Sequence, residues 1–252
     1  MATEDRTPLR RVVAASMIGT TIEWYDFFLY GSAAALVFNK LFFPSFDPFV
    51  GTLLAFATYA VGFVARPLGG IVFGHFGDRI GRKKLLMLSL VMMGVATVLI
   101  GLLPTYAAIG IWAPIGLIVL RLVQGFAVGG EWGGAVLMAA EHGDAARRGF
   151  WASWPQAGVA AGSLLSAGML AIMAASMSEA EFLDWGWRVP FILSAVLVAV
   201  GYYIRNRVSE SPMFEALEEA EDLPKLPAMD VILDRPLAVL VGSGLRGGQE
   251  IN

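Results

Sequence analysis

Ionisable residues inside long apolar stretches are the part of this sequence best able to do chemistry. They are Glu23, Asp26, Arg66, Arg121 and Glu131. A charged side chain at the middle of a bilayer costs roughly 2.5–3.5 kcal/mol on insertion scales, so residues of this kind usually have a function. A carboxyl group can carry a proton, and a guanidinium can hold an anion. We therefore expect proton and anion handling to depend on these residues.

Glu23 and Asp26 form a pair of acids in the first apolar stretch. They are three residues apart, which places both on one face of a helix, and Tyr30 follows on the same face. Two carboxyl groups this close in a low dielectric cannot both ionise cheaply, so one of them favours its protonated form. We predict that Glu23 and Asp26 are proton-coupling residues, with Glu131 as a further one. The alternative is a structural ion pair with an arginine.

A polar helix face is predicted in the fourth apolar stretch. Arg121, Gln124, Val128 and Glu131 follow the spacing i, i+3, i+7 and i+10, which lies along one side of a helix. The planar fork of the Arg121 guanidinium suits a carboxylate. Two interpretations stay open: Arg121 binds an anionic substrate, or it pairs with one of the two acids of the first stretch.

Arg66 precedes Pro67 in the inner half of the second apolar stretch. A proline in a helix removes a backbone donor and can kink the helix. Arg66 either lines an inner vestibule or has a structural partner. Together with Tyr30, Arg121 and Gln124 it makes up the predicted substrate-binding set.

The composition indicates an integral membrane protein, whose surroundings are a lipid bilayer. The chain has 252 residues, of which 57% are apolar and 15% charged, and its mean hydropathy is +0.66. Soluble domains average about 25% charged residues. The sequence has no cysteine, and we find no nucleotide-binding P-loop, no metal-ligand spacing and no G-x-S-x-G motif. We therefore predict no enzyme activity, metal, cofactor or nucleic-acid partner, and expect the proton gradient to be the energy source.

Six apolar segments are long enough to cross a bilayer as helices, which takes about 20 residues each. They cover residues 12–37, 49–73, 85–103, 109–140, 150–173 and 187–204. The sequence thus predicts an all-α membrane protein with a six-helix transmembrane bundle at 1–207. An acidic cytosolic linker is predicted at 208–235, and the truncated start of a seventh helix at 236–252. This pattern favours the interpretation that the chain is a fragment.

Basic residues are distributed unevenly between the predicted spans. If the amino terminus is cytoplasmic, the opposite side holds only Lys40 and, at a helix end, Arg188. Nearly all other basic residues outside the spans then fall on the cytoplasmic side, where short loops retain Lys and Arg. The sequence therefore predicts a multi-pass protein of the cell membrane with a cytoplasmic amino terminus.

The most densely charged turn lies at residues 74–84 (GHFGDRIGRKK), between the second and third spans. Gly77 and Gly81 are expected to allow a sharp reversal with positive φ, and Gly74 a close approach between helices. The turn resembles the signature loop between helices 2 and 3 of the major facilitator superfamily of secondary transporters. The residues that carry this resemblance are Gly74, Asp78, Arg79, Gly81, Arg82 and Lys83.

The resemblance implies a fold of twelve helices, with a 3+3 inverted repeat in each half, of which this chain is the amino-terminal half. It also implies that the six residues of the turn act as a conformational latch in the outward-open state. Asp78 would contact a helix end in the carboxy-terminal six-helix half, which is missing here, and Arg82 would brace it.

Further stretches resemble the metabolite:H⁺ symporter family. They are residues 21–28 (TIEWYDFF), 129–134 (GGEWGG), 187–191 (WRVPF) and 210–214 (ESPMF). The resemblance implies proton-coupled symport of a small organic acid or zwitterion, of the dicarboxylate, 2-oxoglutarate, citrate, shikimate or proline/betaine type. Two alternatives stay open, a passive facilitator of the same solutes and a non-transporting membrane scaffold or sensor.

Overall fold

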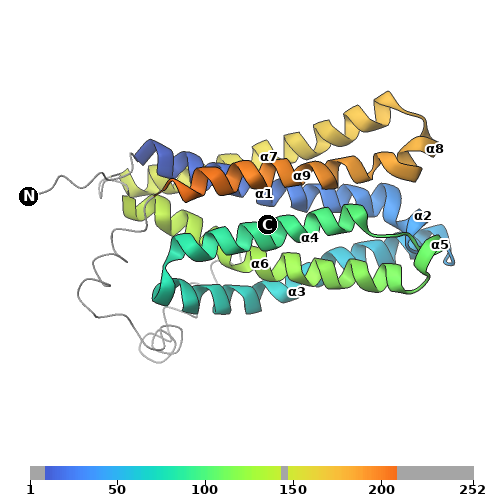
Figure 1. The fold of residues 1–252 in the computed structure, drawn as a ribbon, viewed down its shortest axis with the longest axis horizontal. Helices are drawn as coiled ribbons and strands as arrows, with labels where there is room; N and C mark the ends of the chain where they lie inside the picture. The colour runs from blue at the N-terminus through green and yellow to red at the C-terminus, as the bar shows by residue number, and fades with distance from the viewer. Residues whose placement is uncertain (1–8, 143–146, 209–252) are drawn as a thin grey trace, which may run out of the picture.

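The computed structural model describes residues 9–142 and 147–208, and every regular element within them is helical. Six long helices run side by side along the long axis of the molecule (Figure 1). They are α1 (Leu9–Ala33), α3 (Pro48–Ile80), α4 (Arg82–Leu102), α6 (Trp112–His142), α7 (Arg148–Ser176) and α9 (Arg188–Asn206). Each corresponds to one predicted span, which confirms the all-α six-helix bundle.

Short helical elements connect the long helices. The connection from α1 to α3 contains the π-helix η1 (Ala34–Phe38) and α2 (Asn39–Leu41), and that from α4 to α6 contains α5 (Tyr106–Ile109). The connection from α7 to α9 contains α8 (Glu179–Glu181) and the π-helix η3 (Phe182–Gly186). Apart from Val208, the predicted linker at 208–235 lies outside the described residues, as does the predicted helix start at 236–252.

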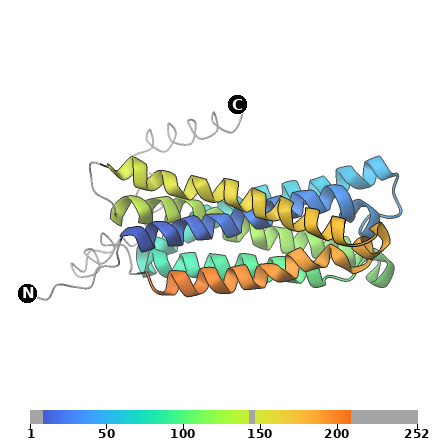
Figure 2. The same cartoon turned by 90° about the horizontal axis from the view of Figure 1, so that it is seen from above.

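Five of the six long helices, α3, α4, α6, α7 and α9, are long and apolar enough to cross a membrane. The helix α1 is the exception, because it carries Ser16, Thr20, Glu23 and Asp26 among its buried residues. Figure 2 shows α1 (dark blue) between α7 and α9, and it packs against both of these and against α6. Its neighbours shield it from lipid, and α1 can therefore carry polar groups that a lipid-facing helix could not.

The connections alternate between the two ends of the bundle (Figure 1). One end, which we call the basic end, holds the start of α1, the turn from α3 to α4, residues 147–150 and the end of α9. The opposite end holds α2, α5 and α8. A salt bridge of 2.8 Å between Lys40 Nζ and Glu179 Oε1 connects α2 to α8 there. Within the described residues, the basic residues that the sequence analysis placed on one side thus share one end of the structure: Arg10, Arg11, Arg79, Arg82, Lys83, Lys84, Arg147, Arg148, Arg205 and Arg207.

The turn between α3 and α4 is tighter than the sequence suggested. The helix α3 continues to Ile80, beyond the predicted end at Phe73, and within this turn only Gly81 adopts a positive φ, of 104°. The prediction for Gly77 was wrong, because this residue is buried within the helix and one left-handed glycine is enough for the reversal. Gly74 does not provide a close approach either, since a Cβ atom there would meet no atom within 4 Å.

Glycines instead bring α3 and α6 into backbone contact nearer the middle of the bundle. A Cβ atom built on Gly125 would lie 2.9 Å from the Cα atom of Gly62 and would overlap its carbonyl group. A Cβ atom on Gly129 would lie 2.7 Å from the backbone nitrogen of Gly70. No side chain fits between the two helices here, so α3 and α6 hold their functional residues at short range.

We expect Gly125→Ala to destabilise the protein by about 1–3 kcal/mol, as overpacking does, because backbone atoms cannot move aside as side chains can. Gly74→Ala is the matched control, in a helix but in open space, and should leave stability unchanged or raise it by up to about 1 kcal/mol. Thermal unfolding of the purified variants in detergent measures both. Equal unfolding midpoints for the two variants would contradict the tight α3–α6 contact.

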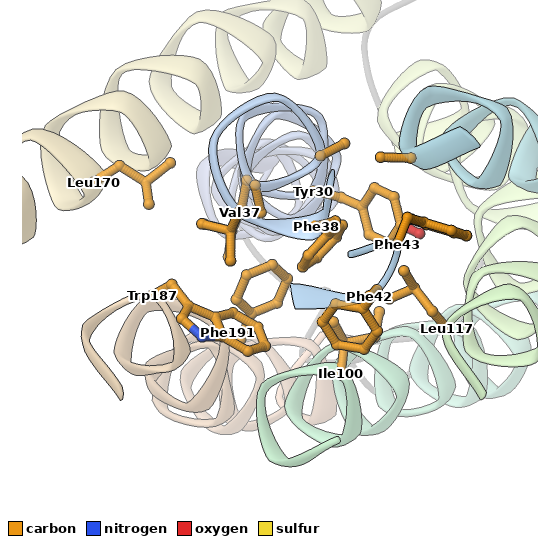
Figure 3. Packing of buried hydrophobic residues seen from close by; sticks show 14 of the residues in the cluster. Tyr30, Val37, Phe38, Phe42, Phe43, Ile100, Leu117, Leu170, Trp187 and Phe191 are labelled. Atoms are coloured by element: carbon orange, nitrogen blue, oxygen red, sulfur yellow. The ribbon is translucent and has the colours of Figure 1, made fainter. Parts of the chain in front are cut away.

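An aromatic cluster fills the bundle towards the end opposite the basic end (Figure 3). Phe38 lies at its centre, with ring centroids 5.2 Å from Phe42, 5.8 Å from Trp187 and 6.2 Å from Phe191. Tyr30 extends the cluster towards the middle of the bundle, at 5.1 Å from Phe38. All five side chains are at most 1% exposed, so this part of the bundle is closed by packed aromatic rings.

Candidate functional site

A small pocket in the middle of the bundle collects most of the charged residues that the sequence singled out. It is lined by Glu23, Asp26 and Phe27 of α1, Arg66 of α3, Met93 of α4, and Arg121, Gln124, Gly125 and Val128 of α6. Residues from four helices therefore meet at one place. The volume of the pocket, ≈ 10 Å³, is room for about one water molecule. The bundle must widen here before an organic solute can enter.

Asp26 and Arg121 are joined through two neutral side chains. Arg121 Nη1 donates to Gln124 Oε1 over 3.1 Å, and Gln124 Nε2 donates to Thr97 Oγ1 over 2.7 Å. Thr97 Oγ1 in turn donates to Asp26 Oδ2 over 2.7 Å. The sequence analysis missed Thr97, because a lone threonine in an apolar helix gives no sign of its partners.

Arg121 lies between two aromatic rings. Its guanidinium carbon is 4.4 Å from the ring centroid of Tyr30 and 4.6 Å from that of Tyr59. Arg121 Nε also donates to the backbone oxygen of Tyr59 over 3.4 Å. The residue is 4% exposed, and within the described part of the chain no carboxylate lies within ion-pair distance of it. Its contact with Asp26 is therefore indirect, and Tyr59 is a further residue that the sequence did not reveal.

Of the other predicted substrate-binding residues, Arg66 lines this pocket, whereas Tyr30 contacts Arg121 from outside the lining. The Tyr30 hydroxyl shares a hydrogen bond of 2.7 Å with Thr58 Oγ1, which holds the ring against Arg121. The Arg66 guanidinium lies over the rings of Phe63 and Phe27, at 4.6 and 5.2 Å. Both guanidinium groups are thus supported by aromatic faces, an arrangement that stabilises a desolvated cation.

The two acids of α1 are buried and incompletely hydrogen-bonded. Glu23 is 4% exposed and Asp26 is 2% exposed. Glu23 Oε2 and Asp26 Oδ1 have no hydrogen-bond partner among the described residues. Because burying an unpaired charged oxygen is costly, a bound proton lowers the cost of keeping these groups in the bundle. Chemically, the site can hold an anion at a guanidinium and a proton at a nearby carboxyl group.

Glu131 belongs to a different cluster, nearer the basic end. It forms an ion pair with Arg205 of α9, and its Oε2 accepts a hydrogen bond of 3.1 Å from Ser89 Oγ. Arg205 Nη1 also donates to the backbone oxygen of Leu86 over 2.7 Å. Gly19 makes room for this pair, because a Cβ atom there would lie 2.9 Å from Glu131 Oε1. A proton-coupling role of Glu131 stays a prediction.

Arg205 itself changes the sequence interpretation. The charge count placed it with the cytoplasmic loop residues, yet its side chain points into the bundle, where it is 6% exposed. It lies near the end of α9, so position along the chain suggested a loop residue. Only the rotation of α9 about its axis turns this guanidinium inward.

The predicted latch residues lie at the basic end, around the turn between α3 and α4. Arg82 Nη2 forms a salt bridge of 3.3 Å with Asp78 Oδ1 across the turn, and Lys83 Nζ donates to the backbone oxygen of Asn206 over 3.0 Å. Arg79 is exposed. Asp78 and Arg82 also line a groove of ≈ 200 Å³ together with Gly74. The latch function of these six residues stays a prediction.

Long apolar helices packed around a buried pocket of acids and arginines define a multi-pass membrane protein with a polar interior site. The sequence profile of the family described as "Sugar (and other) transporter" matches residues 12–224. The chain therefore belongs to this family of the major facilitator superfamily, which confirms the resemblance to that superfamily. The relatives named below are transporters, in agreement with the prediction that the protein is not an enzyme.

Curated relatives are similar to nearly all of this chain. A shikimate transporter of Escherichia coli (strain K12) is 49% identical over 239 residues, which are 94% of this chain and 55% of the relative. A proline/betaine transporter of the same strain is 44% identical over 211 residues, which are 84% of this chain and 42% of the relative. The chain thus spans about half the length of the curated relatives it matches.

Solved structures confirm the fold. The xylose transporter XylE of E. coli, in a partially occluded inward-open conformation, superposes with a TM-score of 0.74 at 18% sequence identity. The match covers 97% of this chain and 60% of the transporter chain. At this level of identity the similarity concerns the arrangement of the helices alone.

Proposed function

We propose that this chain is the amino-terminal half of a proton-coupled symporter for a small organic acid or zwitterion. The observation that carries the proposal is the central pocket, where the carboxyl groups of Glu23 and Asp26 and the guanidinium of Arg121 meet in a space shielded from lipid. The names of the relatives, a shikimate transporter and a proline/betaine transporter, support a solute with a carboxylate.

The chemistry follows from the site residues. Arg121 is held in place by two tyrosine rings and has no ion-pair partner among the described residues, so its fork is available to a solute carboxylate. The solute replaces the hydrogen bond that Arg121 makes to Gln124. A proton on Asp26 removes the negative charge that would otherwise oppose a second carboxylate in the same low-dielectric pocket. The proton and the anionic solute therefore favour each other, as symport requires.

We further propose that the pocket is completed by a carboxy-terminal six-helix half, which matches the length of the relatives. In this proposal the protein lies in the bacterial plasma membrane with its basic end in the cytoplasm. Bacterial relatives, one of them described as an inner membrane metabolite transport protein, support the membrane, and the clustering of basic residues at one end supports the orientation.

The test is an uptake assay in proteoliposomes that contain the protein expressed from its complete gene. Radiolabelled shikimate, proline and glycine betaine are offered with and without an imposed inward proton gradient. We expect the gradient to drive accumulation of at least one of these solutes, and an uncoupler to abolish it. Equilibration without accumulation would instead support the passive facilitator, and absence of flux for all three solutes would contradict the proposal.

A further inference from the structure

We propose that Thr97 is a positioning residue that couples the proton on Asp26 to the solute at Arg121. This inference deepens the symport proposed above and rests on it. No direct contact joins the two charged groups, so any coupling beyond their electrostatic interaction through space runs through the hydrogen-bonding side chains that lie between them. The structure places Gln124 and Thr97 there, each within hydrogen-bond distance of the next group.

The three hydrogen bonds that link Arg121, Gln124, Thr97 and Asp26 form a series in which each residue donates to the next. Arg121 donates to Gln124, Gln124 donates to Thr97, and Thr97 donates to Asp26. This series of hydrogen bonds thus runs from a cation to a carboxyl group, and each bond polarises the next and strengthens it. None of the four residues is more than 4% exposed, so water does not compete strongly with these bonds.

The hydrogen bond between Thr97 and Asp26 can reverse its direction. A threonine hydroxyl has a single proton to donate. Two acceptors lie within reach of Thr97 Oγ1: Asp26 Oδ2 at 2.7 Å, and the backbone oxygen of Met93 at 3.0 Å. The hydroxyl proton points to Asp26 when this acid is ionised. When Asp26 carries a proton, its own O–H donates to Thr97 Oγ1, and the hydroxyl proton turns to Met93.

The reversal at Thr97 also changes how strongly Gln124 binds Arg121. After the reversal Thr97 accepts hydrogen bonds from both Asp26 and Gln124. Its hydroxyl no longer donates to a carboxylate, so its oxygen is less polarised and its hydrogen bond from Gln124 becomes weaker. Gln124 then competes less strongly for the Arg121 fork, which is left for a solute carboxylate. By linkage, a solute bound to Arg121 favours the protonated form of Asp26 to the same extent.

Other charged groups lie near this series of hydrogen bonds, and none of them takes the place of Thr97 in it. Glu23 faces the pocket from α1 and Arg66 from α3. From α9, Arg205 approaches the bundle interior but is held by Glu131 of α6. The helix α4 contributes only neutral groups to the pocket and to the hydrogen-bonded chain. A change at Thr97 therefore removes the link without removing a charge.

The variants Thr97→Val and Thr97→Ser test the inference, because the first removes the hydroxyl at nearly constant volume and the second keeps it. The dissociation constant of shikimate is measured at pH 5.5 and at pH 8 for the purified protein expressed from its complete gene. We expect the wild type to bind about 10-fold more tightly at the lower pH, within the usual range of coupling between sites. For Thr97→Val, the dissociation constant of shikimate at pH 5.5 should be within about 3-fold of the wild-type value. The pH ratio, which is the dissociation constant at pH 8 divided by that at pH 5.5, should fall to about 2-fold or less.

Thr97→Ser should restore the pH ratio, which a merely structural role of the side chain does not require. If Thr97→Val does not purify as a folded protein, Thr97→Ala is judged by the same criteria. The inference is overturned if Thr97→Val, or Thr97→Ala in its place, keeps the wild-type pH ratio. It is also overturned if the variant loses shikimate affinity equally at both pH values. A wild-type protein with no proton-driven uptake would instead overturn the proposed function, so the two failures are distinguishable.

Discussion

Asparagine in place of Asp26 will abolish proton-driven solute accumulation in proteoliposomes, while exchange of external for preloaded solute persists. Asn keeps the size of the side chain and its contact with Thr97, but it can neither bind nor release a proton in this pH range. Exchange needs only the solute site and the conformational change, whereas accumulation needs the proton. Uptake under an imposed pH gradient, compared with counterflow of the same solute, measures the difference.

Asp184→Asn is the control for this prediction, because Asp184 is an exposed acid at the end opposite the basic end. It should leave both accumulation and exchange unchanged. Glu23→Gln is the companion variant, and we expect it to weaken accumulation, since Glu23 lines the same pocket. The proton assignment is wrong if Asp26→Asn and Glu23→Gln both retain pH-dependent accumulation.

The second large effect is expected from the buried ion pair between Arg205 and Glu131. Arg205→Met should destabilise the protein by about 3–5 kcal/mol, because it leaves the Glu131 carboxylate buried without its cation. Glu131, at 1% exposed, would retain only the hydrogen bond from Ser89. Replacing both members of the pair by methionine should recover much of this loss, since a well-packed apolar pair needs no desolvated charge. The midpoint of thermal unfolding in detergent measures the stability of both variants.

Lys40→Met is the matched control, because it breaks the exposed salt bridge to Glu179 that connects α2 to α8. Exposed pairs contribute little, so its unfolding midpoint should equal that of the wild type. An Arg205→Met protein as stable as Lys40→Met would contradict the structural role of the buried pair. Transport by the double variant also decides whether Glu131 couples protons: intact accumulation would make Glu131 a structural residue.

Much of the fold could be predicted from the sequence, because a helix that crosses a bilayer must satisfy its own backbone hydrogen bonds and bury about 20 apolar residues. These requirements are local, and all six predicted segments are helices in the structure. The local geometry of the turn at 74–84 was predicted less well. A glycine permits a positive φ without requiring it, so the sequence did not distinguish Gly81, which adopts one, from Gly77, which stays helical.

The sequence by itself determined which charged residues had to be placed away from lipid, because the cost of exposing Glu23, Asp26 or Arg121 to a bilayer depends on residue type alone. Only the tertiary structure decided their partners. It put Thr97 and Gln124 between Asp26 and Arg121, and it turned Arg205 inward to Glu131. Partners on different helices depend on how each helix is rotated and how deep it lies. That is set by packing such as the glycine contacts between α3 and α6, which no single stretch of sequence specifies.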